Sequence, residues 1–159
     1  MDRVLLRAKF RFSCERIGRM DELMVYAVLC SIGYERYDEF REKLDQLFLQ
    51  KPQDEVLLDL EGRSYKDAML HLCYLFNERQ LDIVQFSKKL MNKLKDIYVA
   101  ESDIEEFGKR MYQLWRYLPK ELSEEEPFHI LSYADDPLSW GDEKQCRELY
   151  EKALYYYDN

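Results

Sequence analysis

Residues that could perform acid–base or metal chemistry are few in this chain of 159 residues. Catalysis requires a positioned nucleophile, acid–base group or metal, and the chain has two histidines, His71 and His129. His71 lies among apolar residues of a predicted helix, so we interpret it as structural. Glu126 and His129 have the Glu-x-x-His spacing that binds metal in di-iron bundles, but Pro127 interrupts it and no second copy exists. The sequence therefore predicts no enzyme, no metal site and no cofactor.

The cysteines and the apolar runs favour a cytoplasmic protein. The four cysteines are far apart and show no C-x-x-C spacing, which is typical of buried free thiols in a reducing compartment. The longest apolar run, residues 23–30, is too short to span a bilayer. The first residues, MDRVLLRAKFRFS, contain cations every two to four residues, so they lack the uninterrupted apolar core of a signal peptide. We therefore expect neither secretion nor membrane contact.

Charge is distributed unevenly along the chain, whose formal net charge is −8. Residues 1–19 carry six cations and two acids, so the rest of the chain carries −12. The densest acid lies in residues 120–143, here called the acidic segment, with eight carboxylates and one lysine. Such a field repels nucleic acid and attracts basic proteins, so a basic protein partner is predicted. Nucleic-acid binding by the basic N-terminus, with Phe10 and Phe12 as stacking groups, is the weaker alternative.

Large aromatic residues alternate with carboxylates in the acidic segment. Tyr133 and Trp140 stand among four acids in SYADDPLSWGDE (132–143), where Pro137 and Gly141 favour turns. Carboxylates can stand for phosphates and aromatic rings for bases, so this surface suits a basic nuclease cleft. The alternative is a solvated loop. The predicted partner-binding residues are Glu124, Glu125, Glu126, Tyr133, Asp135, Asp136, Trp140, Asp142 and Glu143.

The sequence predicts that helices position the predicted partner-binding residues. Only 5 Gly and 4 Pro interrupt the chain, and apolar residues recur at helical spacing in several segments. A Ser102–Glu105 capping box starts one helix, and Asp82 and Asp142 start two others. We expect an all-α compact bundle of about six helices in a single domain, 1–159. The predicted helices are 21–32, 36–49, 64–78, 82–99, 102–118 and 142–157.

Two features of the sequence leave alternatives open. Residues 4–13 and 56–60 alternate apolar and polar side chains, so a minor two-stranded pairing near the N-terminus competes with two helices. Tyr155, Tyr156 and Tyr157 lie about 100° apart on a helix, so at least one is exposed. This tyrosine cluster is an alternative contact surface, because tyrosine is a favoured interface anchor.

A resemblance is carried by residues 70–90, LHLCYLFNERQLDIVQFSKKL. An apolar helix ending in Leu75-Phe76, a short polar turn, and Phe86-Ser87 early in the next helix resemble the opening hairpin of the colicin D-type bacterial immunity proteins. A third helix and an acidic stretch entering a last helix are also similar. The similarity covers residues 69–159, and residues 1–68 are then an N-terminal helical extension.

The resemblance implies a small helical bundle that binds a cognate toxin, a tRNA-cleaving ribonuclease, and blocks its active site with an acidic face. The leading hypothesis is therefore a bacterial, non-enzymatic immunity protein that neutralises a basic nuclease toxin. The alternative is a helical adaptor or subunit of a larger assembly. Formation of a homodimer is left open.

Overall fold

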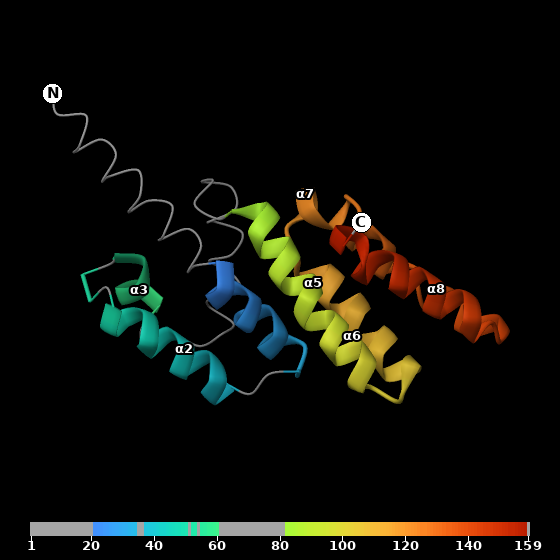
Figure 1. The fold of residues 1–159 in the computed structure, drawn as a ribbon, viewed down its shortest axis with the longest axis horizontal. Helices are drawn as coiled ribbons and strands as arrows, with labels where there is room; N and C mark the ends of the chain where they lie inside the picture. The colour runs from blue at the N-terminus through green and yellow to red at the C-terminus, as the bar shows by residue number, and fades with distance from the viewer. Residues whose placement is uncertain (1–20, 35–36, 51, 54, 61–81, 159) are drawn as a thin grey trace, which may run out of the picture.

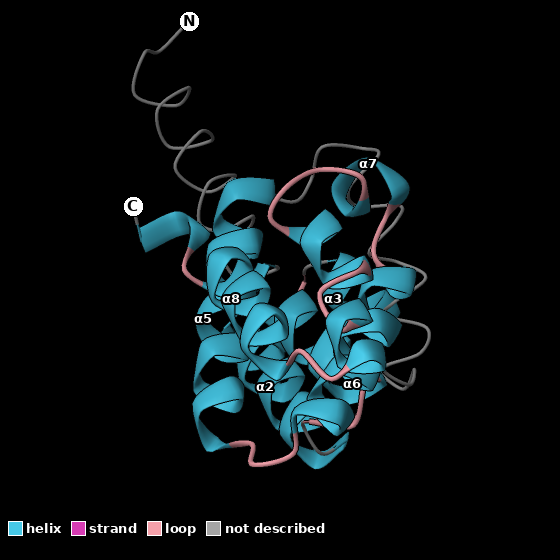
Figure 2. Ribbon diagram, turned by 90° about the vertical axis from the view of Figure 1, so that its right-hand side faces the viewer, coloured by secondary structure: helices cyan, strands magenta, loops and turns pink. Residues whose placement is uncertain are grey.

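A computed structural model describes residues 21–34, 37–50, 52–53, 55–60 and 82–158, and all regular structure in these ranges is helical (Figures 1 and 2). The predicted all-α bundle is thereby confirmed. The α-helices are one at 21–31, α2 (Tyr37–Gln50), α3 (Glu55–Leu60), α5 (Ile83–Ala100), α6 (Ile104–Tyr117), α7 (Lys120–Ser123) and α8 (Glu143–Leu154). Short 3-10 helices occupy η1 (Phe128–Ser132), η2 (Asp136–Trp140) and η3 (Tyr156–Asp158). None of the described helices combines the length and apolarity needed to cross a membrane.

The helix at 21–31 is buried on almost every side, because its sequence is apolar around the whole circumference. Its neighbours are α2 and α5 (Figure 1). Lys43 of α2 and Lys93 of α5 both approach the Tyr26 ring, with Nζ 6.0 and 5.4 Å from the ring centroid. Gly33, with φ of 81°, adopts the left-handed conformation just after this helix, at the predicted stop.

Helices α5, α6 and α8 form the second part of the core around three aromatic rings. Phe107 lies edge-on to Tyr98 and to Tyr150, at centroid distances of 5.3 and 5.0 Å. Lys95 of α5 pairs with Asp158 at 2.6 Å, and Tyr98, further along α5, donates to the earlier residue Glu151 at 3.4 Å. The helices α5 and α8 are therefore antiparallel.

Most predicted elements appear where expected, and one alternative is decided. The segment 55–60 forms α3, so it is a helix and not a strand. Segment 4–13 and the predicted helix 64–78, with His71, Cys14 and Cys73, lie outside the described residues. Cys146 is a buried free thiol, as predicted, and Cys30 is buried as well. At the C-terminus, α8 ends at Leu154, and the tyrosine cluster follows as a cap residue and a 3-10 turn.

The predicted capping box at Ser102 is wrong by one residue. The N-cap of α6 is Asp103, whose carboxylate accepts from the N–H groups of Glu105 and Glu106 at 3.0 and 3.2 Å. Replacing Asp103 with alanine is expected to lower the free energy of unfolding by about 1 kcal/mol, because two N–H groups lose their acceptor. Urea denaturation of Asp103→Ala measures the loss, with Ser102→Ala as the matched control. Equal losses in the two variants would contradict the assignment.

Candidate functional site

The acidic segment folds into short pieces because its residues do not sustain a helix. The four-residue α7 is followed by a turn, η1 and η2. Pro137 is the second residue of η2, and Gly141 caps its end with φ of 79°. The N–H groups of Gly141 and Asp142 then donate to the carbonyls of Leu138 and Pro137, at 3.2 and 3.0 Å. This closure, typical of glycine-terminated helices, fixes Trp140 at the last position of the turn. We call η2 the Trp140 turn.

The structure divides the nine predicted contact residues between the two ends of α8. Glu126 lies near the end of this helix, where its carboxylate is 3.8 Å from Lys152 Nζ. Asp142 and Glu143 form the start of the helix. At about 1.5 Å per residue, the nine-residue span from Glu143 to Lys152 separates the two groups by about 14 Å. The acidic segment is thus not one continuous patch.

The first group is the turn at Glu124–Glu126, which is exposed and partly neutralised. Glu124 lies 3.7 Å from Lys120, and Glu126 has Lys152 as its partner. Glu125 has no ion pair with any residue in the described part of the chain. No exposed large apolar side chain stands within this turn.

The second group surrounds Trp140, whose side chain is 63% exposed. Asp136 is exposed in the same turn. Asp142 is the N-cap of α8 and accepts from Gln145 N–H at 3.0 Å. Glu143 pairs with Arg147, with its carboxylate 2.7 Å from the guanidinium. The prediction that Trp140 is not part of the core is confirmed.

Two of the predicted contact residues point into the protein instead of outward. Tyr133 is half-buried against the core, with its ring centroid 5.6 Å from that of His129. Asp135 is half-buried beside α6 and α8, and burial raises the pKa of its carboxyl, with a smaller contribution from Asp136. Only three of the four carboxylates in 132–143 therefore remain toward solvent or at a helix start.

A further acidic run was missed because it lies far from the acidic segment in sequence. The turn between α5 and α6 carries Glu101, Asp103, Glu105 and Glu106 within six residues. Since α5 and α8 are antiparallel, this turn and the start of α8 lie at the same end of the bundle (Figure 1). We call this end of the bundle the Trp140 end. The run ESDIEE is visible in the sequence, but its location at the same end as the start of α8 depends on the packing of α8.

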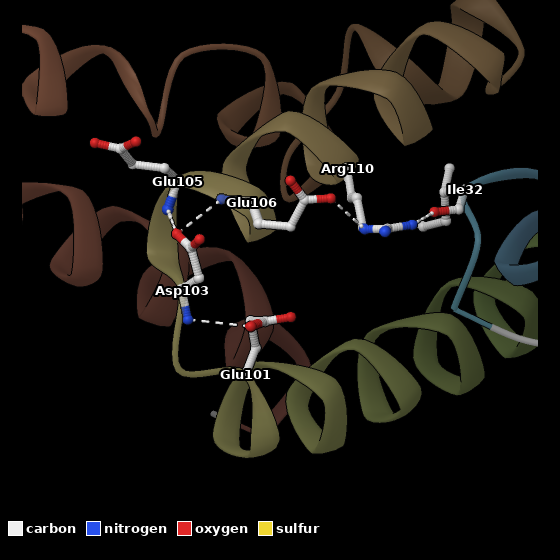
Figure 3. A network of polar contacts seen from close by, with 6 residues as sticks. All are labelled: Ile32, Glu101, Asp103, Glu105, Glu106 and Arg110. Carbon is white, nitrogen blue, oxygen red and sulfur yellow. Dashed lines mark hydrogen bonds and ion pairs between the residues drawn. The ribbon is translucent and has the colours of Figure 1, made fainter.

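The polar contacts of the α5–α6 turn hold these acids in place (Figure 3). Glu101 accepts from Asp103 N–H at 3.0 Å. Glu106 pairs with Arg110 at 3.0 Å, and Arg110 also donates to the carbonyl of Ile32. The positive ends of the α6 and α8 dipoles offset part of the negative charge gathered at these helix starts. The α5–α6 turn is thus tied to α6 and to the residues after the helix at 21–31.

Seven carboxylates share the Trp140 end with one exposed indole. Arg110 and Arg147 neutralise two of them, and the exposed Lys109 and Lys144 lie nearby on α6 and α8. An excess of negative charge remains at the end of the bundle that also carries the exposed indole. The seven are Glu101, Asp103, Glu105, Glu106, Asp136, Asp142 and Glu143.

Candidate metal ligands and pockets are the next features to consider among the described residues. No group of three His, Cys, Asp or Glu residues is arranged to hold a metal within the described ranges. A groove between the helix at 21–31 and α5 is lined by Tyr26, Lys89 and Lys93 together with Glu22 and Asp96, and His129 is not among its residues. Burial raises the pKa of the Cys146 thiol to about 11, so it is a poor nucleophile.

No protein-family model, curated protein or solved structure matches this chain significantly.

Proposed function

We propose that this protein is a non-enzymatic inhibitor, an immunity protein, that binds a basic nuclease toxin through an acidic surface containing Trp140. The observation that carries the proposal is the 63% exposed indole in the same turn as the exposed Asp136 and directly before the acidic start of α8. The resemblance of residues 69–159 to the colicin D-type immunity proteins supports the same function.

The physical argument combines an apolar anchor with a charged rim. An exposed tryptophan gains free energy when a partner covers it, and tryptophan is among the residues that dominate interface affinity. Surrounding carboxylates attract a basic partner over a distance and accelerate association, which gives a strong dependence on salt. They also repel nucleic acid, so the surface favours a basic protein.

The Trp140 end suits this role better than the Glu124–Glu126 turn. Exposed Asp136 and Glu105 have no ion pair within the described part of the chain, so their charge is available to a partner. In the other turn, two of three glutamates already have lysine partners. We therefore place the main contact at the Trp140 end.

The proposal predicts that a gene beside this one encodes a basic nuclease domain, and the test uses that domain, co-expressed in cells and also purified for binding measurements. Trp140→Ala is expected to weaken binding by about 30- to 1,000-fold, the usual range for a buried aromatic anchor, and to abolish protection. Asp136→Asn combined with Glu105→Gln is expected to slow association several-fold and to reduce its salt dependence.

The matched control is Glu121→Gln combined with Glu125→Gln, which removes the same charge from the opposite end of α8. If this control slows association as much as the Trp140-end pair does, the placement of the surface is wrong. Full protection and unchanged affinity in Trp140→Ala would reject the proposed contact.

A helical adaptor is the second candidate, favoured by the other exposed apolar side chains. Leu49 and Val99 are 80% and 76% exposed. Of the nine exposed large apolar side chains in the described ranges, Trp140 alone belongs to the acidic segment. An adaptor or homodimer predicts that Leu49→Gln impairs assembly in sedimentation, whereas the inhibitor predicts full protection by that variant. The exposed large apolar side chains other than Trp140 are Leu49, Leu58, Val84, Val99, Tyr112, Tyr117, Tyr155 and Tyr156.

A further inference from the structure

The start of the Trp140 turn packs against α6 at a glycine. A methyl group on Gly108 would lie 3.0 Å from Asp135 Cβ and 3.1 Å from Tyr150 Oη. The same methyl position is 3.6 Å from Asp135 Oδ2. The carboxyl of Asp135 and the hydroxyl of Tyr150 therefore border the same small space, which exists because α6 has no side chain there.

At this contact the Tyr150 hydroxyl has no hydrogen bond, and the Asp135 carboxyl has no ion pair with a described residue. Tyr150 is fully buried, and its hydroxyl makes no hydrogen bond. Asp135, just before the first residue of η2, is half-buried and forms no ion pair with a described residue. Burial raises the pKa of the Asp135 carboxyl, its own backbone N–H opposes the shift by donating to the carboxyl, and the nearby Asp136 adds to it.

The titratable groups that face Asp135 are neutral or acidic. From α8 they are Tyr150 and the Cys146 thiol, and from its own turn Asp136. Tyr34, after the helix at 21–31, faces Tyr150 from the other side.

The cations on the adjoining helices are engaged elsewhere. Arg110 of α6 pairs with Glu106 and lies over the Tyr34 ring, 5.0 Å from its centroid. Arg147 of α8 pairs with Glu143. Besides its own backbone N–H, a charged Asp135 borders one further donor, the Tyr150 hydroxyl.

We propose that Asp135 and Tyr150 form a protonation-dependent anchor that sets the orientation of the Trp140 turn. When Asp135 takes a proton from solvent, the neutral acid packs against Gly108 without needing a donor. When the proton returns to solvent, the carboxylate draws the Tyr150 hydroxyl toward it, and the residues that follow Asp135 shift with it. The biological role of this anchor rests on the proposed function, in which Trp140 contacts a partner. The anchor would make the presentation of Trp140 to that partner depend on pH.

The experiment follows the two indole N–H groups by NMR in the free, full-length protein labelled with ¹⁵N-tryptophan, from pH 4 to pH 8. The chain has two tryptophans, and Trp115 is an internal control because its Nε1–H donates to the Ser123 carbonyl at 2.8 Å, near α7. Trp140→Phe assigns the signals. The Trp140 signal is expected to titrate with a midpoint above 3.9, the usual aspartate value, while Trp115 stays constant.

Three variants decide the outcome. Asp135→Asn is expected to abolish the titration and to hold the Trp140 signal at its low-pH position. Tyr150→Phe is expected to raise the midpoint by about 0.5–1 unit, because the carboxylate loses one hydrogen-bond donor. The matched control Asp136→Asn, one residue along, is expected to retain the titration.

The proposal is overturned if the Trp140 signal does not titrate, or if it titrates unchanged in Asp135→Asn. An unmoved midpoint in Tyr150→Phe overturns it as well. Because no partner is present, these results are independent of the binding test. Loss of toxin binding in Trp140→Ala leaves the anchor untouched, and failure of the anchor leaves the proposed surface untouched.

Discussion

Replacing Phe107 with alanine is expected to lower the free energy of unfolding by about 3–5 kcal/mol, the range found when a buried phenylalanine is truncated. Phe107 is fully buried and lies edge-on to Tyr98 of α5 and Tyr150 of α8. Its removal leaves a cavity where α5, α6 and α8 meet, and three helices that close around one ring cannot all collapse into it. Urea denaturation followed by circular dichroism measures the loss.

Two controls separate packing from the mere loss of an aromatic group. Tyr112→Ala truncates a side chain on the same helix that is 43% exposed, and a change within about 1 kcal/mol is expected. Tyr150→Phe removes a buried hydroxyl that has no hydrogen-bond partner, so at pH 4, with Asp135 protonated, it should cost little or stabilise. A loss in Tyr112→Ala as large as that in Phe107→Ala would contradict the assignment of the core.

Replacing Asp21 with asparagine is expected to stabilise the protein at pH 8 by up to about 4 kcal/mol, at about 1.4 kcal/mol per pKa unit. Asp21 is fully buried, and Oδ1 accepts from the N-cap N–H of Asp82 at 3.0 Å, while Oδ2 has no partner. Burial raises the pKa of this carboxyl to about 7, although the charge of Lys89 opposes the shift. Asparagine keeps the acceptor and removes the buried charge.

The sign of the pH dependence follows from proton binding. Between the ordinary aspartate pKa of 3.8 and about 7, the folded state holds a proton on Asp21 that the unfolded state has released. The contribution of Asp21 to stability therefore falls as the pH rises through this window, and the penalty is complete above it. The stability difference between Asp21→Asn and the parent protein should thus grow from pH 4 to pH 8.

Urea denaturation at several pH values measures this difference, with Asp96→Asn as the control because Asp96 is an exposed acid of α5. The control should show no comparable growth. A difference between Asp21→Asn and the parent that is constant over the whole range would show that the buried charge is not responsible.

The sequence was informative about helices wherever a local signal existed. Asp82 and Asp142 were correctly predicted as helix starts, since a carboxylate before an amphipathic run satisfies free N–H groups. The choice between Ser102 and Asp103 could not be made from sequence, because both stand three residues before a glutamate. Local alternation in 56–60 fitted a strand or a helix equally, and packing of α3 against α2 accompanies the helix.

The candidate site was less predictable than the helices, because carboxylates that are close along the chain need not be close in space. The acidic segment reads as one patch in sequence, yet α8 places Glu126 beside Lys152 and carries Glu143 to the opposite end. A count of carboxylates in residues 120–143 also leaves out those of the α5–α6 turn, which the fold brings to the same end of the bundle as the start of α8.

The sequence by itself determined that this chain is an acidic, all-α protein with turns around an unusual tryptophan. Those properties depend on composition, periodicity and capping, which act over a few residues. Only the tertiary structure decided that Trp140 shares its end with Glu105, and that Asp135 turns inward against Gly108 and Tyr150. The reason is physical: side-chain burial and the distance between charges depend on how antiparallel helices pack, which no short stretch of sequence contains.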